Sequence, residues 1–371
     1  MARILVTGVK EPAGGVENIV MAYVRHFSPS AITADFAVFG ERLSFEDEIK
    51  ARGGKVYYLP DRKTAPAKYK AALNNIFSEN RYDAVWCSFS GLTNIDFLKK
   101  AKQTGVGLRI AHAHTSGYFW GNKIMKYVVP VLHNINKILL PLYANRLWTC
   151  SEKAAVFMFG KKHSGKAEIV KNAIDAPVFR KNDADRQSVR EEFGIAPYAL
   201  VVGHVGRMCT AKNQFFLLDI FKSILTEKPD AKLLFIGDGE LHDQLIEYTH
   251  TCGLEKSVIY TGTRNDIPRL LQAFDVFALP SVSEGLPVVL IEAQAADIPC
   301  VTSTPAVTKE VDVTETVDFV QLDKPAEFWA KEIIKAAEQK QTDGIEKLKN
   351  SGYDINTEAK KLEKIFLENA R

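Results

Sequence analysis

The sequence predicts an α/β protein of two Rossmann-like, doubly wound domains that face each other across a central cleft. Three observations carry this prediction. Short apolar, β-branched segments alternate with helical patterns twice along the chain, and a polar stretch separates the two series. The 371 residues, 46% of them hydrophobic, suffice for two separate cores. The expected domains are residues 1–180 and 181–353, with a closing helix in 354–371 that packs back on the first domain.

The first half contains segments typical of parallel strands that are covered on both faces. The expected strands are Ile4–Thr7, Ile32–Val38, Val56–Leu59, Ala84–Ser88, Leu108–Ala111 and Leu147–Cys150. Helical patterns lie between them, including Gly15–Phe27 and Ala67–Glu79. This alternation predicts a parallel sheet with helices on both sides.

The second half repeats the alternation after Asn182–Arg186, a polar stretch without apolar periodicity that predicts a linker. Its expected strands are Leu200–Val205, Lys232–Ile236, Val258–Thr261, Val276–Leu279 and Cys300–Thr302. Expected helices are Gln214–Thr226, Leu241–Thr251 and the closing Glu358–Asn369. Open α/β sheets bind ligands beyond the carboxyl ends of their strands, so the motifs that follow strands are the candidates for function.

The composition indicates a cytoplasmic protein. Five cysteines are scattered without a CxxC pair, which argues against a disulfide framework or a zinc cluster and favours a reducing compartment. The N-terminus leads directly into a strand-like segment without the apolar stretch of a signal peptide. Uninterrupted apolar runs are too short for a spanning helix.

The basic residues are concentrated in one region. Residues 99–171 carry a net charge of +11, whereas the remainder of the chain carries −8. This asymmetry predicts an anionic partner, such as a membrane surface or a diphosphate-linked acceptor. The alternative is a solvated face whose compensating acids lie elsewhere in space. A nucleic-acid partner rests on this stretch alone and is not expected.

An apolar segment within this region, Ile124–Leu142, is interleaved with cations and follows three aromatic residues. These residues are Lys123, Lys126, Lys137, Arg146, Tyr118, Phe119 and Trp120. The pattern is typical of an interfacial surface that docks on anionic lipid, which would make the protein peripheral on the inner face of the cell membrane. Core packing explains the apolar residues equally well.

Two motifs of the first half follow predicted strands. Gly14 and Gly15 lie between a strand and a helix, where backbone amides can approach a phosphate, although the GxGxxG spacing is absent. His112 and His114 end another strand and could hydrogen-bond a sugar hydroxyl or a phosphate. The structural alternatives are a ligand-free turn and core histidines.

The second half places two cations after its first strand. Arg207 and Lys212, five positions apart in Gly206–Asn213, can converge on one diphosphate, where fixed cations stabilise a departing nucleoside diphosphate. The alternative is two solvated charges. Gly237 and Gly239 follow the next strand and permit close approach to a nucleotide.

The segment Ser281–Ala293 carries most of the functional signal. Glu284 lies in a loop and Glu292 two turns into a helix, so one carboxylate can accept from sugar hydroxyls and the other from both ribose hydroxyls. Between them, Gly285-Leu286-Pro287 presents helix-start amides to a diphosphate. A glycosidase acid/base pair also fits two carboxylates, but the cationic and glycine-rich loops favour a phosphate ligand.

In order and spacing, these motifs resemble the family 4 retaining glycosyltransferases of the GT-B fold, in the subgroup of bacterial exopolysaccharide and capsule enzymes. The likeness runs nearly end to end. Further markers are Cys150-Ser151-Glu152, Asn172-Ala173-Ile174-Asp175 and Lys212-Asn213. The chain departs from the family at Met208–Ala211, where an acidic residue often precedes the lysine, and at Ser303–Ala306, where many relatives have glycines.

The resemblance implies a role for each matched residue. His114 would approach the transferred sugar, Arg207 and Lys212 would neutralise the diphosphate, and Glu284 would face the donor sugar. The donor would also be bound by a larger set of residues, which comprises Gly14, Gly15, Gly237, Arg264, Gly285, Leu286, Pro287 and Glu292. Of these, Glu292 would bind the ribose, and backbone atoms around Arg264 would pair with the base.

The implied activity is transfer of a hexose, with retention, from a nucleotide sugar to a lipid-linked or polysaccharide-precursor acceptor in surface polysaccharide synthesis. A uridine diphosphate sugar is the expected donor, and no metal or other cofactor is expected. Front-face transfer is favoured because no carboxylate is marked as a nucleophile. Two alternatives remain, a sugar-nucleotide epimerase of the same fold and a non-catalytic nucleotide-sugar sensor.

Overall fold

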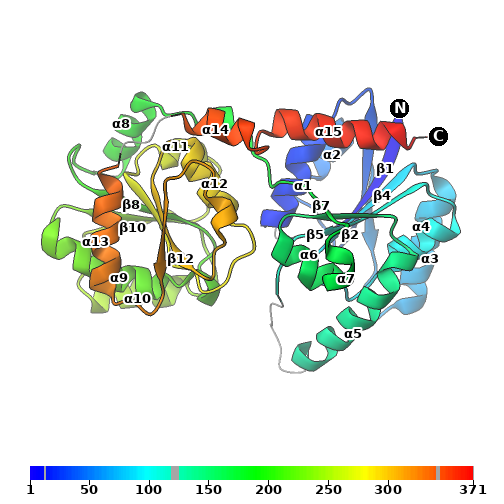
Figure 1. Ribbon diagram of the computed structural model, residues 1–371, viewed down its shortest axis with the longest axis horizontal. Coiled ribbons are helices and arrows are strands. Elements are labelled where there is room, and N and C mark those ends of the chain that lie inside the picture. The colour runs from blue at the N-terminus through cyan, green and yellow to red at the C-terminus, as the bar shows by residue number, and fades with distance from the viewer. Residues whose placement is uncertain (12–13, 118–124, 340–342, 371) are drawn as a thin grey trace. The chain divides into compact units, whose positions relative to one another are not determined.

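A computed structural model of the chain describes residues 1–11, 14–117, 125–339 and 343–370. The chain forms two compact units. Unit 1 comprises Met1–Ala173 and Ile355–Arg371, and unit 2 comprises Ile174–Asp354. The C-terminal segment, red in Figure 1, therefore belongs with the N-terminal sheet.

Unit 1 is built on a seven-stranded parallel sheet of order β3-β2-β1-β4-β5-β6-β7. The strands are β1 (Ala2–Lys10), β2 (Ile32–Phe39), β3 (Val56–Leu59), β4 (Ala84–Phe89), β5 (Leu108–Ala113), β6 (Arg146–Thr149) and β7 (Glu168–Ile169). Strands β2 and β4 are almost wholly buried and β1 is buried over most of its length, as expected when helices cover both faces. The order of the strands reverses direction between β1 and β4, the usual ligand-binding position of this architecture.

The helices of unit 1 alternate with its strands. They are α1 (Gly15–His26), α2 (Glu46–Ala51), α3 (Pro66–Glu79), α4 (Asp96–Gln103), α5 (Met125–Leu139), the 3-10 helix η1 (Leu140–Leu142), α6 (Glu152–Phe159), α7 (Lys161–Ser164) and α15 (Ile355–Glu368). Helix α15 packs on α1. Its fully buried Phe366 meets Phe27 and Trp148 at ring-centroid distances of 5.7 and 5.9 Å.

Unit 2 has a six-stranded parallel sheet of order β10-β9-β8-β11-β12-β13. Its strands are β8 (Val201–Val205), β9 (Lys232–Ile236), β10 (Val258–Tyr260), β11 (Val276–Leu279), β12 (Cys300–Thr304) and β13 (Val317–Gln321). The direction of the strand order reverses between β8 and β11. Each unit therefore has the strand order of a dinucleotide-binding Rossmann domain, and the predicted fold class is confirmed.

The helices of unit 2 cover both faces of its sheet. The longer ones are α8 (Asp183–Glu192), α9 (Gln214–Glu227), α10 (His242–Thr251), α11 (Ile267–Leu271), α12 (Val288–Ala295), α13 (Ala326–Ala337) and α14 (Gly344–Asn350). Three 3-10 turns complete the unit, η2 (Ala176–Phe179), η3 (Thr210–Lys212) and η4 (Lys309–Val311). Within the described ranges, every helix of the chain is too short or too polar to cross a membrane.

The prediction of a linker at Asn182–Arg186 is wrong, because helix α8 begins there. The Asn182 side-chain oxygen accepts hydrogen bonds from the amides of Ala184 and Asp185, at 3.0 and 3.2 Å, and so caps the helix. Val189 and Arg190 are the buried residues of this helix. The first turn is polar because it combines a helix cap with a solvent-exposed face, a pattern that resembles a linker when read alone.

Candidate functional site

Lys212 and Glu284 meet at the carboxyl edge of the unit 2 sheet, where the strand order reverses. Lys212 ends the loop after β8, and Glu284 lies in the loop after β11. The Lys212 Nζ atom lies 2.7 Å from Glu284 Oε1, and the two side chains are 17% and 12% exposed. The Ser281 hydroxyl donates to the same carboxylate oxygen at 2.6 Å. The structure thus brings together two predicted site residues that are 72 positions apart.

Backbone contacts hold these two loops together. The amide of Val282 donates to the Ala211 carbonyl at 2.9 Å. Asn213, in a left-handed conformation with φ 58°, donates through its side-chain amide to the Pro280 carbonyl at 3.1 Å. The Ser303 hydroxyl donates to the Ser281 carbonyl and links the loop to β12. The positions of Lys212 and Glu284 are therefore fixed by the backbone as well as by their own ion pair.

The glycines after β9 allow a third loop to approach this pair of loops. A Cβ atom at Gly237, where φ is +131°, would lie 2.3 Å from the Gly206 carbonyl oxygen. A Cβ at Gly239 would lie 2.4 Å from the Met208 carbonyl oxygen. The Met208 amide donates to the Asp238 carbonyl at 3.0 Å across the same contact. Glycine is therefore needed here for close backbone packing, whatever else the loop binds.

His204, which no sequence motif marked as functional, lies on β8 beneath the loop that carries Arg207 and Lys212. The Nδ1 atom of this buried residue lies 2.9 Å from the Ala278 carbonyl, which can only accept, so the ring donates from Nδ1. Gln214 contacts His204 Nε2 at 3.3 Å and donates to the Arg207 carbonyl at 2.9 Å. Burial lowers the pKa of His204 to about 4, so the ring is neutral near pH 7. A histidine one position before the end of an apolar strand was the only available signal.

Arg207 is the predicted site cation that does not join the Lys212–Glu284 pair. Its Nε lies 3.0 Å from Glu240 Oε2, and the two side chains are 69% and 53% exposed. An ion pair this exposed contributes little stability, so the arginine side chain can be redirected at small cost.

Glu292 lies on α12, preceded by Gly285, Leu286 and Pro287. Pro287 is the residue before the first turn of the helix, and Leu286 is buried in the core. Burial of the Glu292 carboxyl raises its pKa to about 7, although the residue keeps part of its surface exposed. A carboxyl with this pKa gains or loses its proton near neutral pH.

Arg264 has its side chain in an ion-pair network. It contacts Asp266 at 2.8 Å and Glu192 at 3.3 Å, and Arg269 contacts the same two acids. Hydrogen bonds from Arg264 hold the pKa of the Asp266 carboxyl well below its usual range. The guanidinium is therefore structural here, which leaves the backbone of this loop as the part that can meet a ligand.

In unit 1, the paired glycines begin helix α1, but one of their amides is already bonded. The carboxylate of the buried Glu17 accepts from the amides of Gly14 and Lys10 at 3.0 and 3.2 Å. A Cβ at Gly15 would meet no atom of the described residues within 4 Å. Pro12 and Ala13 of the same motif lie outside the described residues, as do Tyr118, Phe119, Trp120 and Lys123 of the predicted membrane segment.

His114 follows the end of β5 and is buried beside His112. The two rings have centroids 4.0 Å apart, and Trp86 donates to His112 Nδ1 at 3.1 Å. Burial lowers the pKa of His114 to about 3, so this ring is neutral. Among the described residues, the Nε2 atoms of both histidines lack a hydrogen-bond partner. His112 belongs to the aromatic core, and His114 carries a polar atom that remains to be satisfied.

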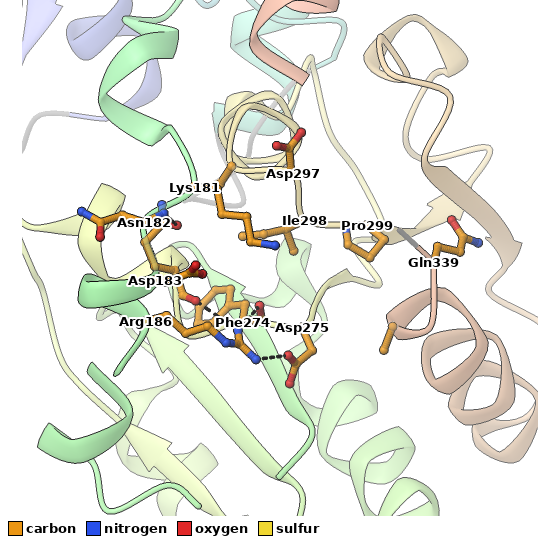
Figure 2. Close-up of a pocket in the computed structure, with 13 residues that line it drawn as sticks. Lys181, Asn182, Asp183, Arg186, Phe274, Asp275, Asp297, Ile298, Pro299 and Gln339 are labelled. Carbon is orange, nitrogen blue, oxygen red and sulfur yellow. Dashed lines mark hydrogen bonds and ion pairs between the residues drawn. The ribbon is translucent and has the colours of Figure 1, made fainter. Parts of the chain in front are cut away.

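A cavity of about 400 Å³ lies at the opposite, amino edge of the unit 2 sheet (Figure 2). Asp275 and Pro299, which precede β11 and β12, line it together with Lys181 and Arg186. Arg186 is held by Asp275 at 2.5 Å, so its charge is used within the fold. The cavity contains none of the predicted site residues and lies away from the edge where such sheets bind ligands. The part of the chain described here holds no cluster of three or more potential metal ligands.

Similarity to known proteins covers both units. A family model described as glycosyl transferases group 1 matches residues 185–354. EpsF of Bacillus subtilis, a protein named as a glycosyltransferase, is 30% identical over 87% of this chain and 85% of its own length. A capsular polysaccharide biosynthesis glycosyltransferase of Staphylococcus aureus, CapH, is 25% identical over 89% of each chain.

Two further similar proteins have a ligand or substrate in their names. A UDP-Gal:alpha-D-GlcNAc-diphosphoundecaprenol alpha-1,3-galactosyltransferase of Escherichia coli is 34% identical over 37% of this chain and 36% of its own length. The crystal structure of Anabaena HepE in complex with UDP superposes with a TM-score of 0.79 at 17% identity, covering 99% of this chain and 100% of HepE. At that identity the superposition bears on the fold, which is the predicted one.

Proposed function

Because this chain belongs to the glycosyl transferases group 1 family, we propose that it transfers a hexose from a uridine diphosphate sugar to a lipid-linked or polysaccharide-precursor acceptor. The names of its relatives support this proposal, since they include a capsular polysaccharide enzyme and a galactosyltransferase with a diphosphoundecaprenol acceptor. UDP in the structurally similar HepE supports uridine as the base. The name of CapH, a capsular polysaccharide biosynthesis enzyme, supports a role in surface polysaccharide synthesis.

The contact between Lys212 and Glu284 is the observation that carries the proposal. It places one cation and one carboxylate, 2.7 Å apart, where a Rossmann sheet binds its ligand. The ammonium can donate to the diphosphate while the carboxylate accepts from hydroxyls of the donor sugar. In the proposed reaction, the bond from the anomeric carbon to the β-phosphate oxygen breaks, and the diphosphate leaves with the bonding electrons. Lys212 stabilises this charge as it develops.

Retention follows if the acceptor attacks from the face that the diphosphate leaves. The acceptor oxygen forms the new bond to the anomeric carbon, and its proton passes to a phosphate oxygen of the leaving group. The exposed Arg207 side chain joins Lys212 on the diphosphate by exchanging Glu240 for phosphate. Glu292 accepts from the ribose hydroxyls, and backbone atoms near Arg264 meet the base.

The remaining predicted residues shape the site mainly through the backbone. Gly237 keeps the β9 loop close to the β8 loop, and the start of α12 after Gly285-Leu286-Pro287 directs amides toward the diphosphate. In unit 1, Gly15 begins helix α1 beside Gly14, whose own amide is bonded to Glu17. His114 keeps the role that the family resemblance implies, near the transferred sugar, with its Nε2 atom buried in the structure.

The test is a transfer assay with the full chain. The donor Kd is measured separately by calorimetry, so that turnover and donor binding can be compared. UDP-glucose, UDP-galactose and GDP-mannose would be supplied with N-acetylglucosaminyl-diphosphoundecaprenol, and the anomeric configuration of the product read by NMR. We expect transfer with retention from a UDP sugar. We expect Lys212→Ala to lower turnover by about 10²- to 10³-fold, because it removes a charge contact made in the transition state. Its donor Kd should change by less than about tenfold.

The matched control is Lys228→Ala, at an exposed lysine just after α9 in the same unit. An equal loss of donor binding and turnover in Lys212→Ala would count against the proposed role. Epimerisation of the donor without acceptor would favour the epimerase alternative, and donor binding without any turnover would favour the sensor alternative.

A further inference from the structure

Helix α5 of unit 1 is packed with polar side chains facing inward. The His133 ring accepts from the Leu92 amide at 3.2 Å through Nδ1, and its Nε2 lies 3.1 Å from the Phe157 carbonyl. Asn136 donates to the Leu92 carbonyl at 2.7 Å. Both side chains are buried, so these bonds fix the rotation of the helix about its axis.

The outward face of α5 and the following η1 turn is apolar. Six large apolar residues, called here the α5 stripe, are exposed to solvent: Tyr127, Val128, Val131, Ile135, Ile138 and Leu142. Ile138 is 78% exposed and Val131 58%. From Val128 onward these residues recur every three or four positions, and Tyr127 adjoins Val128, so all six lie along one side of the helix. A surface helix normally has the reverse arrangement, so this stripe indicates an interaction surface.

Cations adjoin the α5 stripe. Lys99 and Lys102 of α4 lie over the Tyr143 ring at 5.8 and 5.6 Å, and Lys102 donates to the Leu142 carbonyl at 2.8 Å. Lys137 lies over the Phe157 ring at 5.7 Å, on the α6 side of the helix. The exposed Lys161 and Lys162 begin α7 directly after α6. From Phe97 through Ser151 the sequence has no Asp or Glu, so helix α5 itself contributes no acid to this face.

The length and charge of this face indicate which kind of partner it binds. Helix α5 has 15 residues and is about 22 Å long, which is less than the apolar thickness of a bilayer. A second copy of the chain paired through the same face would set cations against cations, which opposes a symmetric dimer. An anionic lipid surface satisfies both features, because it accepts apolar side chains at shallow depth and attracts lysines.

We propose that the α5 stripe inserts into the headgroup region of an anionic bilayer, with the helix lying in the membrane plane and the neighbouring lysines on phosphate groups. Figure 1 shows α5 at the periphery of unit 1. The inference rests on the proposed function in one respect, since a lipid-linked acceptor requires the enzyme at a membrane. The inference adds which surface of the protein contacts the membrane.

The test is co-sedimentation of the full chain with vesicles of phosphatidylcholine containing about one third phosphatidylglycerol. We expect binding by the unmodified chain and at least about tenfold weaker partitioning for Ile135→Gln/Ile138→Gln, which removes apolar contact from an exposed face. We expect a similar loss for Lys161→Glu/Lys162→Glu and for pure phosphatidylcholine vesicles. Matched controls in unit 2 are Val178→Gln/Tyr198→Gln, at exposed apolar residues, and Lys222→Glu/Lys228→Glu, at exposed lysines.

Three outcomes would overturn the inference: no vesicle binding by the unmodified chain, equal losses in the control pairs, or a dimer that dissociates in Ile135→Gln/Ile138→Gln. The last would assign the stripe to a second copy of the chain and is read by light scattering. UDP binding, measured separately by calorimetry, should be unchanged in all four variants. If the unmodified chain bound vesicles but not UDP, the proposed function would be overturned and this inference would stand.

Discussion

The ammonium group of Lys212 has a partner before any donor arrives. Glu284 and Lys212 are mostly buried, and the Ser281 hydroxyl completes the contact. Because an ammonium has three donors, a diphosphate can bind Lys212 without breaking its bond to Glu284. The pair therefore holds the cation in the position where charge develops and avoids reorganisation during the reaction.

Glu292 should make donor binding depend on pH. Its carboxyl has a pKa raised to about 7 by burial, and ribose hydroxyls donate to the ionised form. We expect UDP-glucose affinity to rise with pH through this range, by up to about tenfold per pH unit below 7, because binding requires loss of the proton. Calorimetric titrations between pH 5.5 and 8 measure this slope. UDP-glucose is the suitable probe because its diphosphate does not titrate there.

The variant Glu292→Gln is the control, since it cannot ionise and should bind weakly with a flat profile. The same slope in this variant would assign the pH dependence to another group. The folding stability of the ligand-free protein depends on pH in the opposite direction. A carboxyl whose pKa is higher in the folded state stabilises the fold at low pH, and this contribution is lost as the pH rises from about 4.5 toward 7.

At the scale of elements, helix α15 completes the core of unit 1 from the far end of the chain. Phe366 is fully buried between Phe27, Trp86 and Trp148. We expect Phe366→Ala to lower the free energy of unfolding of unit 1 by about 3–5 kcal/mol, because it leaves a cavity among aromatic rings. Urea unfolding followed by tryptophan fluorescence measures this, since Trp86 and Trp148 lie in that core.

The neighbouring Leu367 is 38% exposed, so Leu367→Ala serves as the matched control and should cost much less. Equal and small effects of both substitutions would show that α15 contributes little to the stability of unit 1.

The strands were largely predictable, but some elements were not. Strands β3, β9 and β11 have the predicted bounds because each is a short run of apolar or β-branched residues. The sequence did not predict β7 and β13, which lie at sheet edges, where exposed and half-exposed residues interrupt the apolar pattern. Helix α8 was mistaken for a linker because its cap and exposed first turn are polar.

At the scale of the whole molecule, the strand order explains which site contacts the sequence could predict. Lys212 and Glu284 follow the two strands that flank the reversal, so their meeting is a consequence of topology. The pairing of Arg207 with Glu240 and the bond from Gly14 to Glu17 depend on side-chain choices within loops. His204 and Gln214 were missed because their role depends on a contact from strand to helix.

A crystal structure of the chain with UDP tests the central claim most directly. We predict the β-phosphate within about 3 Å of Lys212 Nζ, at the carboxyl ends of β8 and β11, with the ribose hydroxyls on Glu292. UDP bound instead in the cavity lined by Lys181 and Arg186, at the amino edge of the same sheet, would contradict it.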